Sequence, residues 1–203
     1  PDGSNTIVST NSAAKWLTVD TVARRLESVQ ANDTLLLQGN LSKETTEKCL
    51  EAAASAGART VLNPSPIGFS YDDIWPLVSL AVVNEIEAVQ LGNSEDPETA
   101  GRHLLKVGVE TVVVTLGSDG AMAIDEADRI TLKAPKMNVV DTAGAGDAFV
   151  GSLVAALDMG LSLMHSMKFA VQVASLTVTQ RGTTSAFPSQ EKIANLLKCL
   201  PNV

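Results

Sequence analysis

The segment Asp141–Asp147, with the sequence DTAGAGD, has the residue types and spacing to bind and react with an anion. It leads into a strongly helical stretch. The start of a helix leaves backbone N–H groups unpaired and carries the positive end of the helix dipole, so glycines there let an anion approach closely. We therefore predict an anion hole at Gly144, Ala145 and Gly146. Asp147 stands beside it, placed to take a proton from a hydroxyl that attacks a phosphorus atom held by those amides.

The same segment has other interpretations. An ordinary capped helix with a tight glycine turn is the better-supported one for so short a pattern alone, because such patterns recur by chance. A Walker A loop would need Gly-Lys-Ser/Thr, and no lysine is present. A dinucleotide fingerprint would need Gly or Ala where Phe149 stands. A nicotinamide-dependent dehydrogenase is further disfavoured because the glycines come late in the chain rather than after its first strand.

The elements that must position this segment alternate between short β-branched runs and amphipathic stretches, which predicts βαβ units and a mostly parallel sheet. Ser42 is predicted to cap a helix over 43–56, and Asp96 to start one that ends near Gly108. Each helix can serve as a crossover. The predicted strands are Thr34–Gln38, Thr60–Asn63, Leu80–Val83 and Thr111–Thr115.

The pattern changes after Thr115. Gly117 and Gly120 predict a turn, followed by an antiparallel excursion. The rest of the chain is predicted to be helical. An isolated strand is predicted at Asn5–Ser9. The two short runs of the excursion are Ala121–Ile124 and Arg129–Lys133, and the late helices are Asp147–Met159, Met164–Val178 and Ser189–Leu200.

Composition sets wider limits. A chain of 203 residues suits one main domain, and 45% hydrophobic with only 3% aromatic residues indicates an α/β core of Ala, Val, Leu and Ile. A formal charge of −8 without a basic cluster argues against a nucleic-acid partner. Cys49 and Cys199 are expected to be buried free thiols in a reducing compartment. No leader-like start or long apolar run is present, so we expect a cytoplasmic protein without a membrane partner.

Three segments, in order along the chain, resemble motifs of the ribokinase-like (PfkB) carbohydrate kinases. Val140–Phe149 resembles the C-terminal signature of that family, which is long and specific. Val83–Glu87 is similar to its Asn-x-x-Glu motif, and Thr115–Gly120 to its nucleotide-binding strand and turn. The resemblance implies a three-layer α/β/α ribokinase-like fold with a mostly parallel sheet, and transfer of the ATP γ-phosphate to a sugar hydroxyl.

The resemblance also implies residue roles. Asp147 would be the catalytic base, beside the anion hole of Gly144, Ala145 and Gly146. Asn84 would contact a nucleotide phosphate, and Glu87 would organise magnesium and its waters. Magnesium prefers carboxylate, water and phosphate oxygens, although a helix-start Asn and a solvated Glu would be the commoner structural explanation of that pair. The remaining ATP contacts would be Thr115, Gly117, Ser118, Asp119 and Gly120.

A monovalent cation such as potassium is often bound next to the anion hole in this family. Asp141 and the carbonyl of Ala143 match that loop, and the resemblance suggests further carbonyls at Thr177, Gln180 and Gly182. Ala186 stands where ribokinases tend to offer a hydroxyl, so dependence on the cation is open.

The resemblance aligns this chain with the later part of a family member. The Gly-Gly-x-x-x-Asn motif of the family is absent, and with it most of the sugar-binding groups. We expect residues 1–10 to be a remnant lid strand and 11–203 the nucleotide-binding and catalytic domain. Exposed sheet edges would then favour a homodimer or aggregation. Asn40 replaces a Glu that contacts ribose in ribokinases, so ribose is not assumed. The alternative function is an inactive, nucleotide-binding fragment lacking the sugar site.

Overall fold

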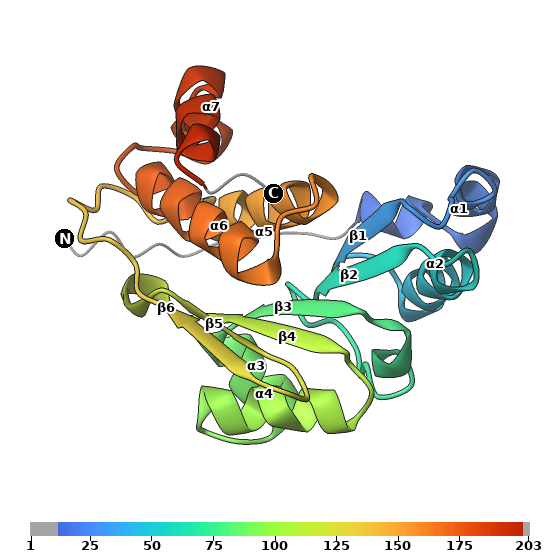
Figure 1. Ribbon diagram of the computed structural model, residues 1–203. Helices are drawn as coiled ribbons and strands as arrows, with labels where there is room; N and C mark the ends of the chain where they lie inside the picture. Colours follow the sequence, from blue (N-terminus) through green and yellow to red (C-terminus); the bar gives the residue numbers. More distant parts are fainter. Residues whose placement is uncertain (1–11, 201–203) are drawn as a thin grey trace. The chain divides into compact units, whose positions relative to one another are not determined.

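The computed structural model describes residues 12–200, in two compact units (Figure 1). The described part of the first unit comprises 12–115 and 122–129, and that of the second comprises 116–121 and 130–200. The strands form one sheet in the order β1-β2-β3-β4-β5-β6, and β1 to β4 are parallel. The predicted strand at Asn5–Ser9 and the predicted lid remnant at 1–10 lie outside the described residues.

The strands agree with the sequence prediction to within one residue at each end. β3 is apolar and buried along its length except at Asn84, as expected for a strand covered on both faces. Thr34 pairs with Arg59, and Leu80 with Thr111, so neighbouring strands end at the same edge. Their bounds are β1 Thr34–Gln38, β2 Arg59–Asn63, β3 Leu80–Asn84, β4 Thr111–Thr115, β5 Ala121–Ile124 and β6 Arg129–Leu132.

Crossover helices of the first unit pack on these strands. The Ser42 hydroxyl accepts the Thr45 N–H at the start of α2, and the Asp96 carboxylate accepts the Thr99 N–H at the start of α4, so both predicted caps are confirmed. α3 and α4 lie side by side against β3 and β4 (Figure 1). Helix α1 was not predicted, and none of its residues is buried. The bounds are α1 Val19–Leu26, α2 Lys43–Ser55, α3 Glu85–Gly92 and α4 Pro97–Lys106.

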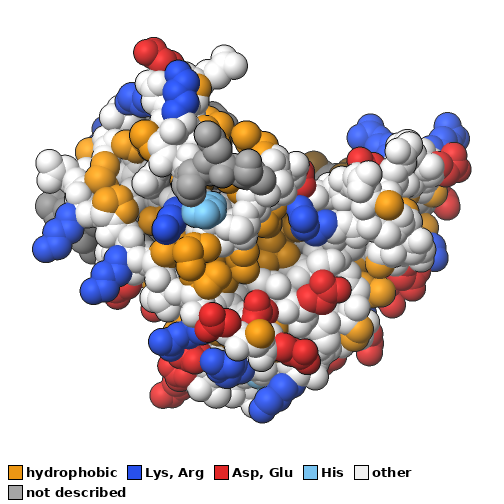
Figure 2. Space-filling model, viewed as in Figure 1, with side chains coloured by type: hydrophobic (Ala, Val, Ile, Leu, Met, Phe, Trp, Pro, Cys, Tyr) orange, Lys and Arg blue, Asp and Glu red, His pale blue; other side chains and the backbone are white. Residues whose placement is uncertain are grey.

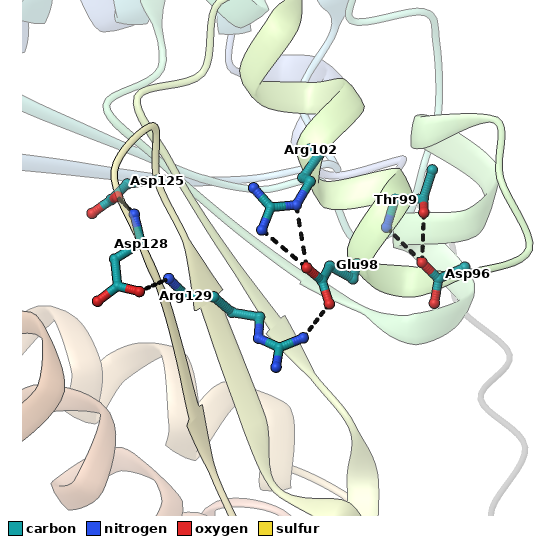
Figure 3. A network of polar contacts seen from close by, with 7 residues as sticks. All are labelled: Asp96, Glu98, Thr99, Arg102, Asp125, Asp128 and Arg129. Carbon is teal, nitrogen blue, oxygen red and sulfur yellow. Dashed lines mark hydrogen bonds and ion pairs between the residues drawn. The ribbon is translucent and has the colours of Figure 1, made fainter.

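A surface ion-pair network links Glu98 of α4 to Arg129, the first residue of β6, within the first unit (Figure 3). Glu98 accepts from Arg102 one turn later, at 3.0 Å between Oε1 and Nη2, and its other oxygen pairs with Arg129. Asp125 accepts the backbone N–H of Asp128 at 2.8 Å and so shapes the turn between β5 and β6. Exposed ion pairs contribute little individually, so this network adds little to the stability of the unit.

The second unit holds α5 Ala145–Asp158, α6 Leu163–Thr177 and α7 Gln190–Lys198. α5 and α6 pack against each other along their length. They share a buried apolar cluster that α7 helps to cover. The three late helices were predicted, with ends shifted by two residues or fewer. The cluster comprises Ala148, Ala156, Leu161, Phe169 and Val173, covered by Ile193, Leu196, Leu197 and Leu200.

The cysteine prediction is right for one residue and wrong for the other. Cys49 on α2 is buried and free, whereas Cys199 is free but exposed. Cys199 caps the end of α7, and no residue of that helix is fully buried, so the apolar periodicity overstated its burial. Figure 2 shows Lys and Arg side chains scattered among acidic ones on the face in view. No helix in the described part of the chain is long and apolar enough to cross a membrane.

Candidate active site

The predicted anion hole lies at the start of α5. Gly144 is the N-cap, with φ +76° and ψ −3°, a left-handed conformation that glycine adopts without strain. A Cβ there would approach Phe187 Cε1 and Thr183 Cα at 3.2 Å each. No side chain caps this helix start, unlike those of α2, α3, α4, α6 and α7. The start of α5 therefore has no side-chain cap at Gly144, and its Ala145 N–H donates to the Thr142 carbonyl at 3.3 Å.

Asp147 lies in the first turn of α5 and is exposed. The helix begins at Ala145, two residues before the predicted start, so Ala145, Gly146 and Asp147 share that turn. A Cβ at Gly146 would meet no atom within 4 Å, which leaves room beside its backbone. The structure thus brings the carboxylate and the glycine amides of the sequence hypothesis together in one helical turn.

Asp141 holds the loop before α5 in place. Its Oδ1 accepts the Ala143 N–H and its Oδ2 the Gly182 N–H, each at 3.0 Å. These two backbone hydrogen bonds, with Arg181 as a smaller influence, lower the pKa of Asp141. These hydrogen bonds therefore connect three of the predicted cation ligands, Asp141, Ala143 and Gly182.

The other two predicted cation ligands lie at the end of α6. The Thr177 hydroxyl is buried and donates to the Val173 carbonyl, and the Thr177 carbonyl accepts the Gln180 N–H at 3.2 Å. Within residues 12–200, no group of three or more His, Cys, Asp or Glu side chains could hold a metal ion. The ligands of any cation here would be backbone carbonyls and a single carboxylate. Such oxygen ligands suit a hard, monovalent ion.

Asn84 and Glu87 form a capping box at the start of α3. Asn84 Oδ1 accepts the Glu87 N–H at 2.8 Å, and Glu87 Oε2 accepts the Asn84 N–H at 2.9 Å. Glu87 is only 9% exposed, so the explanation as a solvated Glu is wrong. The spacing of an N-cap residue and a Glu three positions later could have predicted this box from the sequence.

The turn after β4 is also confirmed. Leu116 N–H donates to the Gly120 carbonyl at 2.8 Å, and Asp119 N–H to the Leu116 carbonyl at 2.9 Å. Gly120 has φ +103°, and a Cβ there would lie 2.0 Å from the Leu132 carbonyl oxygen, so only glycine fits. Thr115 ends β4, and Gly117, Ser118 and Asp119 are exposed in a 3-10 turn (Gly117–Asp119) that could contact a nucleotide.

The sequence hypothesis missed two residues near the Asn84–Glu87 pair. Asn63, at the end of β2, donates from Nδ2 to the Val82 carbonyl at 2.9 Å and links β2 to β3. Tyr71 lies in the connection between those strands, and burial, with the charge of Glu87, raises its pKa to about 12. The surroundings of these two residues arise only from tertiary packing, so no local sequence motif marks them.

Comparison with known proteins decides the family. The sequence profile of the pfkB family carbohydrate kinases matches residues 1–190. The chain belongs to this family. It is 27% identical over 198 residues to a ribokinase of Staphylococcus aureus, covering 95% of this chain and 65% of that one. It is 29% identical over 202 residues to a deoxyribokinase of Salmonella typhi, covering 97% and 66%.

The fold agrees with that of a solved relative. The structure of an Arabidopsis thaliana ribokinase complexed with ribose and ATP superposes with a TM-score of 0.83 at 27% identity. The match covers 97% of this chain and 66% of that protein. The chain therefore spans about two thirds of the length of these relatives, and the predicted ribokinase-like α/β fold is confirmed.

Proposed function

We propose that this member of the pfkB family transfers the γ-phosphate of ATP to a sugar hydroxyl, with Asp147 as the general base. The observation that carries the proposal is the start of α5, where a left-handed Gly144 without a side-chain cap, the following backbone amides and an exposed carboxylate share one turn. Phosphoryl transfer depends mainly on positioning and on stabilising charge, and both are within reach of such a turn.

Different groups of the chain would serve phosphate binding, proton transfer and nucleotide binding. The amides of Gly144, Ala145 and Gly146 would hold the charge that develops on the phosphoryl oxygens. The Asp147 carboxylate would take the proton of the attacking hydroxyl. Asn84, Thr115 and the turn 117–120 would contact the nucleotide.

Magnesium fits Glu87, a buried carboxylate held by one oxygen, with hard-oxygen chemistry that suits the ion. When bound, it would neutralise phosphate charge. Asp141, Ala143, Thr177, Gln180 and Gly182 would provide the oxygens for a potassium ion beside the anion hole.

Substitution of the base tests the proposal. Asp147→Asn should lower kcat for sugar phosphorylation by at least about 100-fold, because the general base is lost. The Kd for ATP should stay within about twofold, because the groups proposed to contact the nucleotide are unchanged. Asp158→Asn, at the other end of α5, is the matched control and should leave kcat unchanged. Turnover retained by Asp147→Asn would refute the role of Asp147.

The relatives suggest which sugars to test. One is named a ribokinase and another a deoxyribokinase, so ribose and deoxyribose are the first acceptors. Asn40 follows β1 and Gly39 and is partly buried, and its neutral amide differs from the Glu of ribokinases. We propose a small sugar whose identity a panel of pentoses and hexoses would resolve.

A second candidate function is nucleotide binding without sugar transfer. The sequence contains no Gly-Gly-x-x-x-Asn segment, whereas the segments that resemble the nucleotide site are all present. Calorimetry with ATP and a coupled phosphorylation assay on the same 203-residue chain separate the two candidates. ATP binding with no transfer to any sugar of the panel would favour the second.

A further inference from the structure

The segment that follows α6 packs on the glycine turn at the start of α5, within the second unit. The ring of Phe187 and the backbone of Thr183 fill the space that a side chain at Gly144 would take, since a Cβ there would lie 3.2 Å from Phe187 Cε1 and 3.2 Å from Thr183 Cα. Carbon atoms prefer a separation of about 3.5–4.0 Å, so no side chain fits between them. Two segments that are distant in the sequence are therefore in close contact.

The backbone that carries the Phe187 ring is itself fixed. It follows the 3-10 turn η4 (Thr184–Ala186), whose last residue is only 2% exposed. Phe187 has φ −61° and ψ 138°, the extended conformation that the following Pro188 requires. After the proline, Ser189 caps α7. The ring therefore starts from a backbone that is anchored on both sides.

Gly144 depends on its surroundings to keep its conformation. Glycine changes φ at little cost, and Gly144 has φ +76°. The carboxylate of Asp141 holds the loop before it by accepting the Ala143 and Gly182 N–H groups, each at 3.0 Å. Phe187 adds an apolar contact at Gly144 itself, on the side where a side chain would otherwise stand.

The exposure of Phe187 indicates a local role. It is 39% exposed, whereas Phe149 and Phe169 of the same unit are 3% exposed each. A ring that keeps so much contact with water contributes less to the core than a buried one. Its removal should therefore affect the glycine turn more than the stability of the whole unit.

We propose that Phe187 is a positioning residue for the anion hole. Its ring packs on Gly144, keeps this residue in the left-handed conformation, and so keeps the first-turn amides of α5 in a fixed orientation. Donors that are already oriented stabilise developing charge without reorganising during the reaction, and a small misplacement of such groups lowers the rate. The effect on catalysis rests on the proposed function, whereas the positioning of the turn does not.

Hydrogen exchange tests the positioning without any ligand. The Ala148 N–H donates to the Gly144 carbonyl at 2.9 Å. Phe187→Ala should speed amide exchange at Ala148 by about tenfold, because the turn opens more often, while the middle of α6 is unchanged. Met164→Ala is the matched control, since Met164 is 42% exposed and lies at the other end of α6, and it should leave Ala148 unchanged. Unchanged exchange at Ala148 in Phe187→Ala would overturn the positioning role.

A pair of substitutions tests the contact itself. Gly144→Ala adds a Cβ where the ring stands, and Phe187→Ala makes room for it. The Tm losses of these two variants should therefore be non-additive, the double variant losing less than their sum. The losses of Gly144→Ala and Met164→Ala should add. Additive losses in both pairs would overturn the contact.

Sugar phosphorylation tests the consequence for catalysis. Phe187→Ala should lower kcat by about tenfold, while the Kd for ATP changes by less than about twofold, because the groups proposed to contact the nucleotide lie on other segments. Phe187→Leu keeps an apolar side chain against the turn and should recover most of the loss. Unchanged kcat in Phe187→Ala, or equal losses of kcat and ATP affinity, would overturn the role in catalysis. A wild-type chain that phosphorylates no sugar would count against the proposed function, and the exchange and Tm results would still decide whether Phe187 positions the turn.

Discussion

The phenol of Tyr71 gives the chain a measurable dependence on high pH. Burial, with the charge of Glu87, raises its pKa from 10.0 to about 12. Because the pKa of Tyr71 is higher in the folded chain than in the unfolded chain, its neutral phenol contributes stability below pH 10. This contribution is lost as the pH rises toward 12. Tyrosinate absorbance of the native chain should therefore appear well above pH 10, and that of the urea-unfolded chain near about 10. Coincident titrations of the two states would contradict the prediction.

Residue-scale geometry was predictable where a local motif carried it. The glycine pattern predicted the helix start that holds Gly144 and Asp147, and the spacing of Asn84 and Glu87 could have predicted their capping box. The burial of Glu87 was not predictable, because it depends on packing around α3. Tyr71 had no signal in the sequence, since its burial depends on how the connection between β2 and β3 packs in the folded chain.

The contact between α3 and α4 depends on a glycine at the scale of whole elements. A Cβ at Gly92 would lie 2.4 Å from the Ala100 carbonyl oxygen and 2.6 Å from Ala100 Cβ. Gly92→Ala should therefore force the two helices apart and lower the free energy of unfolding by about 1–3 kcal/mol in urea titrations. Gly151→Ala on α5 is the control, because a Cβ there meets nothing within 4 Å. It should be neutral or stabilising by up to about 1 kcal/mol. Equal effects of both substitutions would exclude the close contact as the cause.

Elements were predicted well because their patterns are strong. The β-branched runs predicted the ends of the strands to within one residue, and Ser42 and Asp96 predicted two helix starts. The start of α5 was placed too late, because helix propensity rises after the glycines whereas the helix begins as soon as Gly144 has turned the chain. α1 was missed although Val19, Val22 and Leu26 recur at the spacing of one helical face, and none of its residues is fully buried.

At the scale of the whole molecule, β1 presents an exposed apolar side chain through which copies of the chain can associate. Leu36 of β1 is 38% exposed. Exposed apolar side chains favour association between copies, whereas a charged side chain in their place disfavours it. We therefore expect concentration-dependent dimerisation of the 203-residue chain in sedimentation velocity, reduced by Leu36→Lys. Met159→Lys, at an exposed apolar residue after α5, should leave it unchanged. A single monomeric species at all concentrations would contradict the prediction, and equal loss of dimer in both variants would assign it to net charge rather than to Leu36.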